Sequence, residues 1–255
     1  MSLTDFIVKK AMPTPRVESF GTYLFIGPHP DDIEIGAGAT AAKLAAAGKK
    51  VTFLICTDGR FGDGLTDLRG EELVEKRREE AIGSAAALGV TDVRFLPFRD
   101  GGGYDPEELK RAIAAVISDV QPDMIFCPDP DVPNEFHEDH LNVGNICKRL
   151  AFSSSNRGIM EEMGLKEAPL LACGFYMTAR PSAFVKTKGY LGKQLSALFE
   201  NHLSQFPEGS GDRKSVDTYL KLRSHMYGLR NFCSSAEGFR VIGKGQMHCL
   251  PEISK

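Results

Sequence analysis

The sequence has no tryptophan, no long apolar run and little net charge. Its 255 residues carry a formal net charge of −3, which argues against an extended nucleic-acid or anionic-membrane surface. No stretch approaches the roughly 18 apolar residues that a membrane span needs, and the first residues lack the apolar core of a signal peptide. We therefore expect a cytoplasmic protein without a membrane span or a nucleic-acid partner.

Cysteine pairs of the C-x-x-C type are also missing, although six cysteines are present. Their absence excludes a zinc ribbon and a thioredoxin-like redox motif. The cysteines are scattered through apolar segments, which favours buried thiols in a reducing compartment. They are Cys56, Cys127, Cys147, Cys173, Cys233 and Cys249.

What the sequence does contain is a regular alternation of strand-like and helix-like segments over about residues 20–152. The apolar patterns predict strands at 22–28, 49–57, 92–98 and 122–128, and helices at 32–48, 70–89, 105–120 and 137–152. Continuously apolar strands that alternate with helices predict an α/β fold with a mainly parallel sheet and helices on both faces. Right-handed crossovers make this sheet doubly wound and Rossmann-like.

The C-terminal part, about residues 153–255, has a looser pattern. It predicts a strand at 170–178, helices near 188–206 and 214–229, and a late strand at 239–243. We expect these additions to belong with the Rossmann-like core to a single domain spanning residues 1–255.

Polar residues follow the first and fourth predicted strands, where doubly wound sheets bind their ligands. His29, Asp31 and Asp32 come directly after the first strand, and two adjacent carboxylates repel each other unless a cation or proton is near. After the fourth strand, His137 and His140 are three residues apart at the start of a helix and can share one face. Two histidines and one carboxylate are a typical catalytic zinc set, although the same ligands accept iron(II) or cobalt.

The segment PHPDDIEIG, followed about a hundred residues later by HEDH, resembles the LmbE/PIG-L family of zinc-dependent N-deacetylases. Further pieces occur in family order over roughly residues 20–243, among them TDGRFG, RREEAIGSAAALGV, RDGG, QPDMIF, KQLSALFENHLSQF and SSAEGFRV. The resemblance implies a hydrolase that removes the N-acetyl group from an N-acetylglucosamine-type sugar or conjugate, a small-molecule amino-sugar substrate. It leaves open which group is joined to the sugar.

The family also implies a role for each residue of the two motifs. His29, Asp32 and His140 would hold the zinc ion. Asp31 would act as the general base on zinc-bound water, and His137 would stabilise the oxyanion. Physical reasoning agrees, because zinc lowers the pKa of its water to about 7 and a nearby carboxylate can then complete the deprotonation.

Substrate contacts follow from the same resemblance. Arg77 corresponds to an arginine in the substrate pocket, and Asp100 to a residue expected to bind sugar hydroxyls. Arg60 is a further candidate for contact with the substrate. The alternative for Arg77 is a surface ion pair with Glu80, one helical turn away.

Two acidic residues are expected to hold other residues of the site in position without binding the metal themselves. Asp139 would orient His137 or His140 through the free ring nitrogen, unless it is a solvated acid at a helix N-terminus. Glu80 would support Arg77. Some relatives complete the site from a neighbouring subunit, which leaves a homo-oligomer open.

Two other classes of protein compete with the deacetylase. The segment GAGATA at 36–41, with Asp58 twenty residues after Gly38, matches a dinucleotide-binding fingerprint and would indicate an oxidoreductase. However, HPDDIEI separates these glycines from the strand end and should place them inside the helix. A non-catalytic metal- or sugar-binding module is the other alternative, but such a module has no need of Asp31 beside the ligands.

Overall fold

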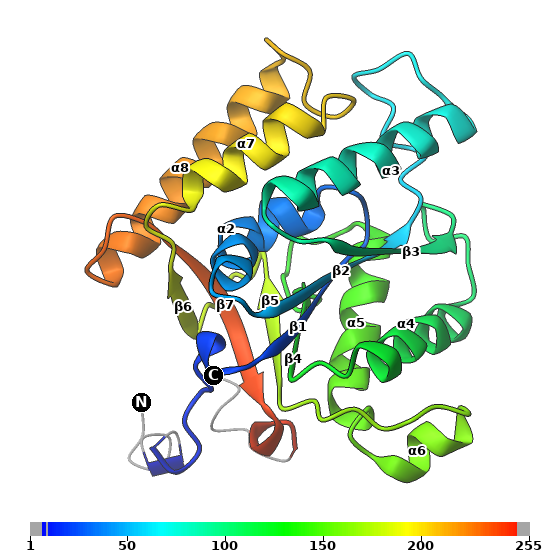
Figure 1. The fold of residues 1–255 in the computed structure, drawn as a ribbon, viewed down its shortest axis with the longest axis vertical. Coiled ribbons are helices and arrows are strands. Elements are labelled where there is room, and N and C mark those ends of the chain that lie inside the picture. The colour runs from blue at the N-terminus through cyan, green and yellow to red at the C-terminus, as the bar shows by residue number, and fades with distance from the viewer. Residues whose placement is uncertain (1–6, 9, 249–255) are drawn as a thin grey trace.

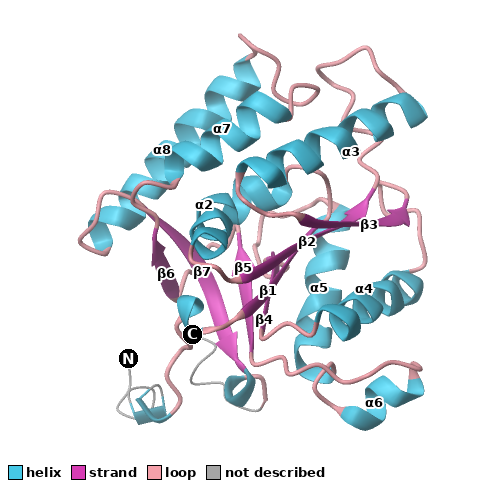
Figure 2. Cartoon of the chain, viewed as in Figure 1, coloured by secondary structure: helices cyan, strands magenta, loops and turns pink. Residues whose placement is uncertain are grey.

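The computed structural model describes residues 7–8 and 10–248, so that Cys249 lies outside the described part. Its centre is a seven-stranded sheet in the order β3-β2-β1-β4-β5-β7-β6, with helices on both faces (Figures 1 and 2). Strands β1 to β5 run parallel to one another, whereas β7 is antiparallel to both β5 and β6. The predicted mainly parallel, doubly wound α/β sheet is therefore confirmed.

The strands are β1 (Thr22–Gly27), β2 (Lys50–Thr57), β3 (Asp92–Phe98), β4 (Met124–Pro128), β5 (Ala172–Tyr176), β6 (Ala183–Lys186) and β7 (Ala236–Gly243). The helices are α2 (Asp32–Ala46), α3 (Gly70–Ala87), α4 (Pro106–Val120), α5 (Glu138–Ser153), α6 (Arg157–Glu162), α7 (Leu191–Asn201) and α8 (Gly211–Arg230). The strand β6 was not predicted, because its four residues are too few to show an apolar period.

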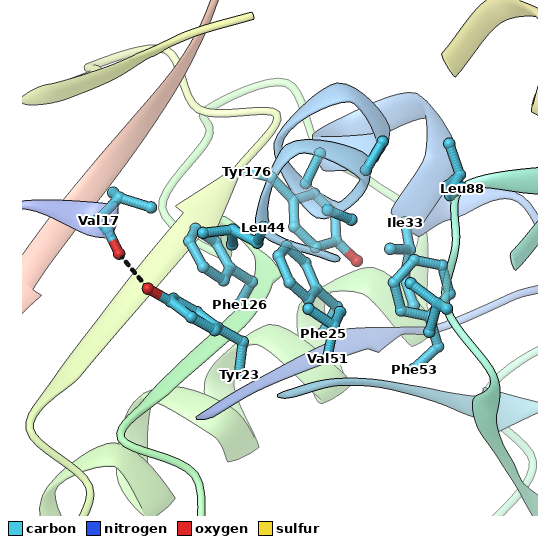
Figure 3. Close-up of a cluster of buried hydrophobic side chains, with 14 of the residues drawn as sticks. Val17, Tyr23, Phe25, Ile33, Leu44, Val51, Phe53, Leu88, Phe126 and Tyr176 are labelled. Carbon is cyan, nitrogen blue, oxygen red and sulfur yellow. Dashed lines mark hydrogen bonds between the residues drawn. The ribbon is translucent and has the colours of Figure 1, made fainter. Parts of the chain in front are cut away.

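Alternate residues of the central strand serve the two faces of the sheet. Tyr23 and Phe25 point toward α2, into the cluster drawn in Figure 3. Leu24 and Ile26 point the other way and pack against α4 and α5. Because both sets are fully buried, β1 lies at the centre of the fold and its carboxyl end is held rigidly.

Close packing also explains the glycines of GAGATA. Gly36 lies within α2, and a Cβ atom there would stand 2.3 Å from Cδ2 of Tyr176. The hydroxyl of Tyr176 donates a hydrogen bond of 2.7 Å to the carbonyl of Ile26, which fixes the ring against the helix. The glycines thus let α2 approach β5 instead of forming a strand-to-helix turn around a phosphate.

The order of the strands reverses at β1. From β1 the chain proceeds outward through β2 and β3, and then returns to β4 on the other side of β1. The carboxyl ends of β1 and β4 therefore flank a topological switch point, where such folds bind ligands.

Among the C-terminal additions, α7 packs on α2 and α3, and α8 packs on β7 and α7. In the described part of the chain, no helix is both long and apolar enough to cross a membrane.

Candidate metal centre

The two predicted motifs meet at the switch point. His29 follows β1, Asp31 precedes the first residue of α2, and Asp32 begins that helix. His137 and His140 lie at the start of α5, after the loop that follows β4. Residues more than a hundred positions apart are thus brought to one point by the pairing of β1 with β4.

The three predicted ligands form a compact group. One ligand atom from each of His29, Asp32 and His140 lies within 4.8 Å of the others. The Nδ1 atom of His29 is 3.1 Å from Oδ2 of Asp32, and Nε2 of His140 is 3.3 Å from Oδ1 of Asp32. The donor set of two imidazoles and one carboxylate therefore fits a divalent metal ion.

A second group of candidate ligands consists of His29, Asp100, His137 and Asp139. The Asp139 carboxylate already accepts hydrogen bonds from the backbone N–H groups of Gly101 (2.8 Å) and Gly102 (2.9 Å) and from the Tyr104 hydroxyl (2.7 Å). Because these donors occupy its lone pairs, we favour the first group as the metal centre.

The remaining ring nitrogens of the two predicted histidine ligands face carboxylates. Nε2 of His29 is 3.1 Å from Oδ2 of Asp139 and 3.2 Å from Oδ1 of Asp100. Nδ1 of His140 is 3.0 Å from Oε2 of Glu135. Carboxylates in this position fix the tautomer and orientation of a metal-binding imidazole, so both rings are held with their free nitrogen toward Asp32.

Two of these contacts differ from the sequence-based expectation. Asp139 is fully buried and bonded to His29, whereas we expected it to orient His137 or His140. Glu135, which also accepts a 2.8 Å hydrogen bond from the backbone N–H of His137, was not predicted at all. Its only sequence signal was an acid two residues before the histidine motif.

The carboxylates around His29 and His140 raise the pKa values of both imidazoles. Burial alone lowers the pKa of His29, but hydrogen bonds with Asp100, Asp139 and Asp32 outweigh it and raise the pKa well above its usual value. In His140, burial is likewise outweighed by the charge of Asp32, and the pKa rises to about 9. Burial raises the pKa of Asp32, but His140 and His29 bring it well below the usual range. The cluster thus stabilises positive charge where a metal ion would bind.

Asp31 points away from its own helix. It is the N-cap residue of α2, yet its side chain caps no backbone N–H, and its φ of 115° is rare for a residue other than glycine. Instead, Oδ2 accepts a 3.2 Å hydrogen bond from Arg77. Burial raises the pKa of Asp31 to about 6, although the Arg77 guanidinium opposes this rise. A carboxylate that titrates close to neutrality is suited to general base catalysis.

Arg77 lies beneath Asp31 and not on the surface. Only 3 % of the residue is exposed. Its guanidinium also donates 2.7 Å hydrogen bonds to the carbonyls of Pro30 and Gly59. The alternative of a surface ion pair with Glu80 is therefore wrong. Glu80 is buried as well, and accepts hydrogen bonds from the backbone N–H (2.9 Å) and hydroxyl (2.6 Å) of Ser204.

His137 is the most accessible member of the group. Its side chain is 47 % exposed, and Nδ1 lies 4.0 Å from Oδ2 of Asp139. The centroid of its ring is 4.6 Å from that of His29 and 5.0 Å from that of His140. Burial and the charges of these two histidines lower its pKa. A neutral, accessible imidazole at this position can donate a hydrogen bond to a bound substrate.

The predicted substrate residues lie at different distances from this centre. Asp100 contacts His29, and also accepts a 3.2 Å hydrogen bond from the backbone N–H of Phe61. Arg60 does not contact the predicted metal ligands in these ion pairs: its guanidinium pairs with Asp58 at 2.7 Å and with Glu71 at 2.9 Å.

A cavity of about 850 Å³ opens beside β5 and β7, and Asp129, Arg180, Arg240 and His248 are among its lining residues. None of the predicted metal ligands lines it. The cavity therefore does not mark the metal centre, although Asp129 directly follows β4 at the same edge of the sheet.

Fold and site together define a class of protein: a doubly wound α/β domain with a His/Asp group that could hold a metal ion, and a largely buried carboxylate beside it, at the switch point. A family model described as "PIG-L: GlcNAc-PI de-N-acetylase" matches residues 24–151. The chain belongs to this family, as the resemblance of its motifs predicted.

Relatives of known name support the same assignment. Diacetylchitobiose deacetylase from Thermococcus kodakarensis is 33 % identical over 89 % of this chain and 85 % of its own. A 1D-myo-inositol 2-acetamido-2-deoxy-α-D-glucopyranoside deacetylase from Kineococcus radiotolerans is 34 % identical over 56 % of this chain and 49 % of its own. The solved structure of N,N′-diacetylchitobiose deacetylase from Pyrococcus horikoshii has a TM-score of 0.87 and 28 % identity, and covers 98 % of this chain and 97 % of that chain.

Proposed function

We infer that the protein is a metal-dependent N-deacetylase that hydrolyses the N-acetyl group of an N-acetylglucosamine-type sugar or conjugate. The observation that carries this proposal is Asp31, a carboxylate with only 12 % of its side chain exposed and a pKa of about 6, directly beside a group that could hold a metal ion. A module that only binds a metal or a sugar would gain nothing from such a base. The named relatives, all deacetylases of N-acetylated amino sugars, support the same reaction.

The residues divide the chemistry of amide hydrolysis among them. His29, Asp32 and His140 would hold the metal ion, which supplies a Lewis acid that polarises the amide carbonyl and lowers the pKa of water. Asp31 accepts the proton of the attacking water. His137 donates a hydrogen bond to the carbonyl oxygen as negative charge develops there. Asp31 then returns its proton to the leaving amine, so that the base is regenerated in each cycle.

We infer that the metal is zinc, because two imidazoles and one carboxylate with an open position are a typical catalytic zinc set. Iron(II) and cobalt(II) accept the same ligands and are the alternatives. The buried free thiols of Cys56, Cys127, Cys147 and Cys173 support a reducing, cytoplasmic setting.

For the substrate, we propose Asp100, which contacts His29, as the residue closest to the sugar. Arg77 lies beneath Asp31 and would act on the substrate only through that carboxylate. Similarity along nearly the whole chain to a diacetylchitobiose deacetylase supports a disaccharide as the first candidate. The inositol conjugate named for the second relative comes next, because that similarity covers only 56 % of this chain.

The proposal is tested by release of primary amine from a panel of N-acetylglucosamine conjugates, with protein reconstituted with one equivalent of zinc. We expect amine from at least one conjugate, and N,N′-diacetylchitobiose should rank above the inositol conjugate. No amine from any member of the panel, with zinc confirmed bound, would contradict the deacetylase and favour a non-catalytic module.

A further inference from the structure

We propose that the turn between α7 and α8, residues 202–205, is a positioning element that holds the general base Asp31 in place. This inference rests on the proposed function, because it assigns to Asp31 the role of the base. The turn lies outside residues 24–151, the part of the chain that matches the family model. It would give the C-terminal helices a direct part in the site.

The first contact of this turn reaches α2. His202 is completely buried, and its Nε2 atom lies 3.4 Å from Oε1 of Glu34, which is 3 % exposed. Glu34 stands one helical turn after Asp31, on the same first turn of α2. A buried carboxylate paired with a buried imidazole is costly to separate, so this contact fixes the start of the helix.

The second contact reaches α3, which carries Arg77. Ser204 donates from its backbone N–H (2.9 Å) and from its hydroxyl (2.6 Å) to the two oxygens of Glu80. Glu80 lies one turn after Arg77 on α3. Both oxygens of a buried carboxylate are thus satisfied by a single residue of the turn, which locks α3 at the level of Arg77.

The third contact reaches the loop that receives the Arg77 guanidinium. Gln205 donates a 2.6 Å hydrogen bond from Nε2 to the carbonyl of Gly62. A Cβ atom on Gly62 would lie 2.4 Å from Nη1 of Arg77 and 2.7 Å from Oε1 of Gln205. The loop therefore lies between the turn and the guanidinium and has no room to shift.

The three contacts explain how Asp31 keeps an unfavourable backbone conformation. A residue other than glycine with φ of 115° persists only where its surroundings fix it. Here α2, α3 and the loop at 59–62 each contact the turn at 202–205, and Arg77 joins them to the Asp31 carboxylate. Weakening the turn should therefore misplace Asp31 without removing any group that touches the substrate.

The test compares two serine-to-alanine variants. Ser204→Ala removes the hydroxyl that binds Glu80. Ser210→Ala removes the side chain that caps α8 by accepting from the Arg213 N–H at 3.2 Å, away from the site. Both should lower Tm. Only Ser204→Ala should lower kcat, by about tenfold to a hundredfold as expected for a misplaced catalytic group, with KM and zinc content unchanged. Ser204→Thr, which keeps the hydroxyl, should restore most of the rate.

Two further measurements separate positioning from general damage. In an Asp31→Asn background, Ser204→Ala should cause no additional loss of residual turnover, because the base it positions is gone. Hydrogen exchange in peptides covering residues 28–36 should be faster in Ser204→Ala than in Ser210→Ala, and this readout needs no turnover. Equal exchange in the two variants, or a full additional loss in the Asp31→Asn background, would overturn the proposal. Failure of the unmutated protein to release amine would count against the proposed function alone.

Discussion

Replacement of Arg77 by methionine should weaken both the fold and the general base. The guanidinium is buried and makes three hydrogen bonds, to the carbonyls of Pro30 and Gly59 at 2.7 Å and to Oδ2 of Asp31 at 3.2 Å. Methionine retains most of the apolar stem but leaves two buried carbonyls and one carboxylate without their donor. Removing one partner of a buried ion pair typically costs about 3–5 kcal/mol.

That loss corresponds to a fall in Tm of about 6–20 °C, since each kcal/mol shifts Tm by about 2–4 °C in proteins near this size. The effect on catalysis has a definite sign. Burial raises the pKa of Asp31 to about 6, and the Arg77 guanidinium opposes this rise. Removal of the guanidinium should therefore raise the pKa of Asp31 further. Because the base must be ionised to accept a proton, the acidic limb of the kcat/KM profile should move to higher pH.

Calorimetry and a pH–rate profile measure the two effects independently. Arg77→Lys is the matched control, because it keeps the charge but cannot span the three acceptors with a planar fork. It should lose stability while its acidic limb stays nearer to that of the unmutated protein. An Arg77→Met variant that melts within about 2 °C of the unmutated protein, or that keeps the same acidic limb, would refute this reasoning.

Three other perturbations should have measurable outcomes. Zinc binding at pH 8 should release protons, because His140 has a pKa of about 9 and must be neutral to bind metal. Titration calorimetry in buffers of different ionisation enthalpy measures the number of protons released. A binding enthalpy that does not depend on the buffer would contradict the prediction. Glu135→Gln should weaken zinc affinity about 10- to 100-fold, because it removes the carboxylate 3.0 Å from Nδ1 of His140. Competition with a chelator measures this affinity, and an unchanged value would contradict the prediction. Gly36→Ala should be strongly destabilising, because its Cβ would lie 2.3 Å from the Tyr176 ring. In Gly192→Ala the new Cβ meets nothing within 4 Å, so this control variant should be tolerated. Equal denaturation midpoints for the two variants would refute the packing argument.

Much of the fold and of the ligand group follows from local sequence patterns. Apolar runs predict the strands, and the parallel crossovers place the residues after β1 and β4 at one edge. That is why His29 and His140 could be expected to meet. In contrast, β6 has four residues at the edge of the sheet and shows no usable period.

The supporting contacts could not be predicted, because they depend on how distant elements are oriented. Asp139 bonds to His29 because α5 starts with its first turn facing β1, an angle that no local pattern encodes. Glu80 and Ser204 are 124 residues apart and meet only because α7 packs on α3. Glu135 lies in a loop without periodicity, so that its contact with His140 had no signal beyond its charge.

The most direct test of the account measures turnover and zinc content together in Asp31→Asn. The substitution keeps the shape of the side chain and leaves His29, Asp32 and His140 in place, so zinc should bind at one equivalent as in the unmutated protein. Release of amine from the best conjugate should fall by about 10²–10⁴-fold, the contribution typical of a general base. An Asp31→Asn variant that binds zinc and turns over at the unmutated rate would contradict the assignment of Asp31 as the base.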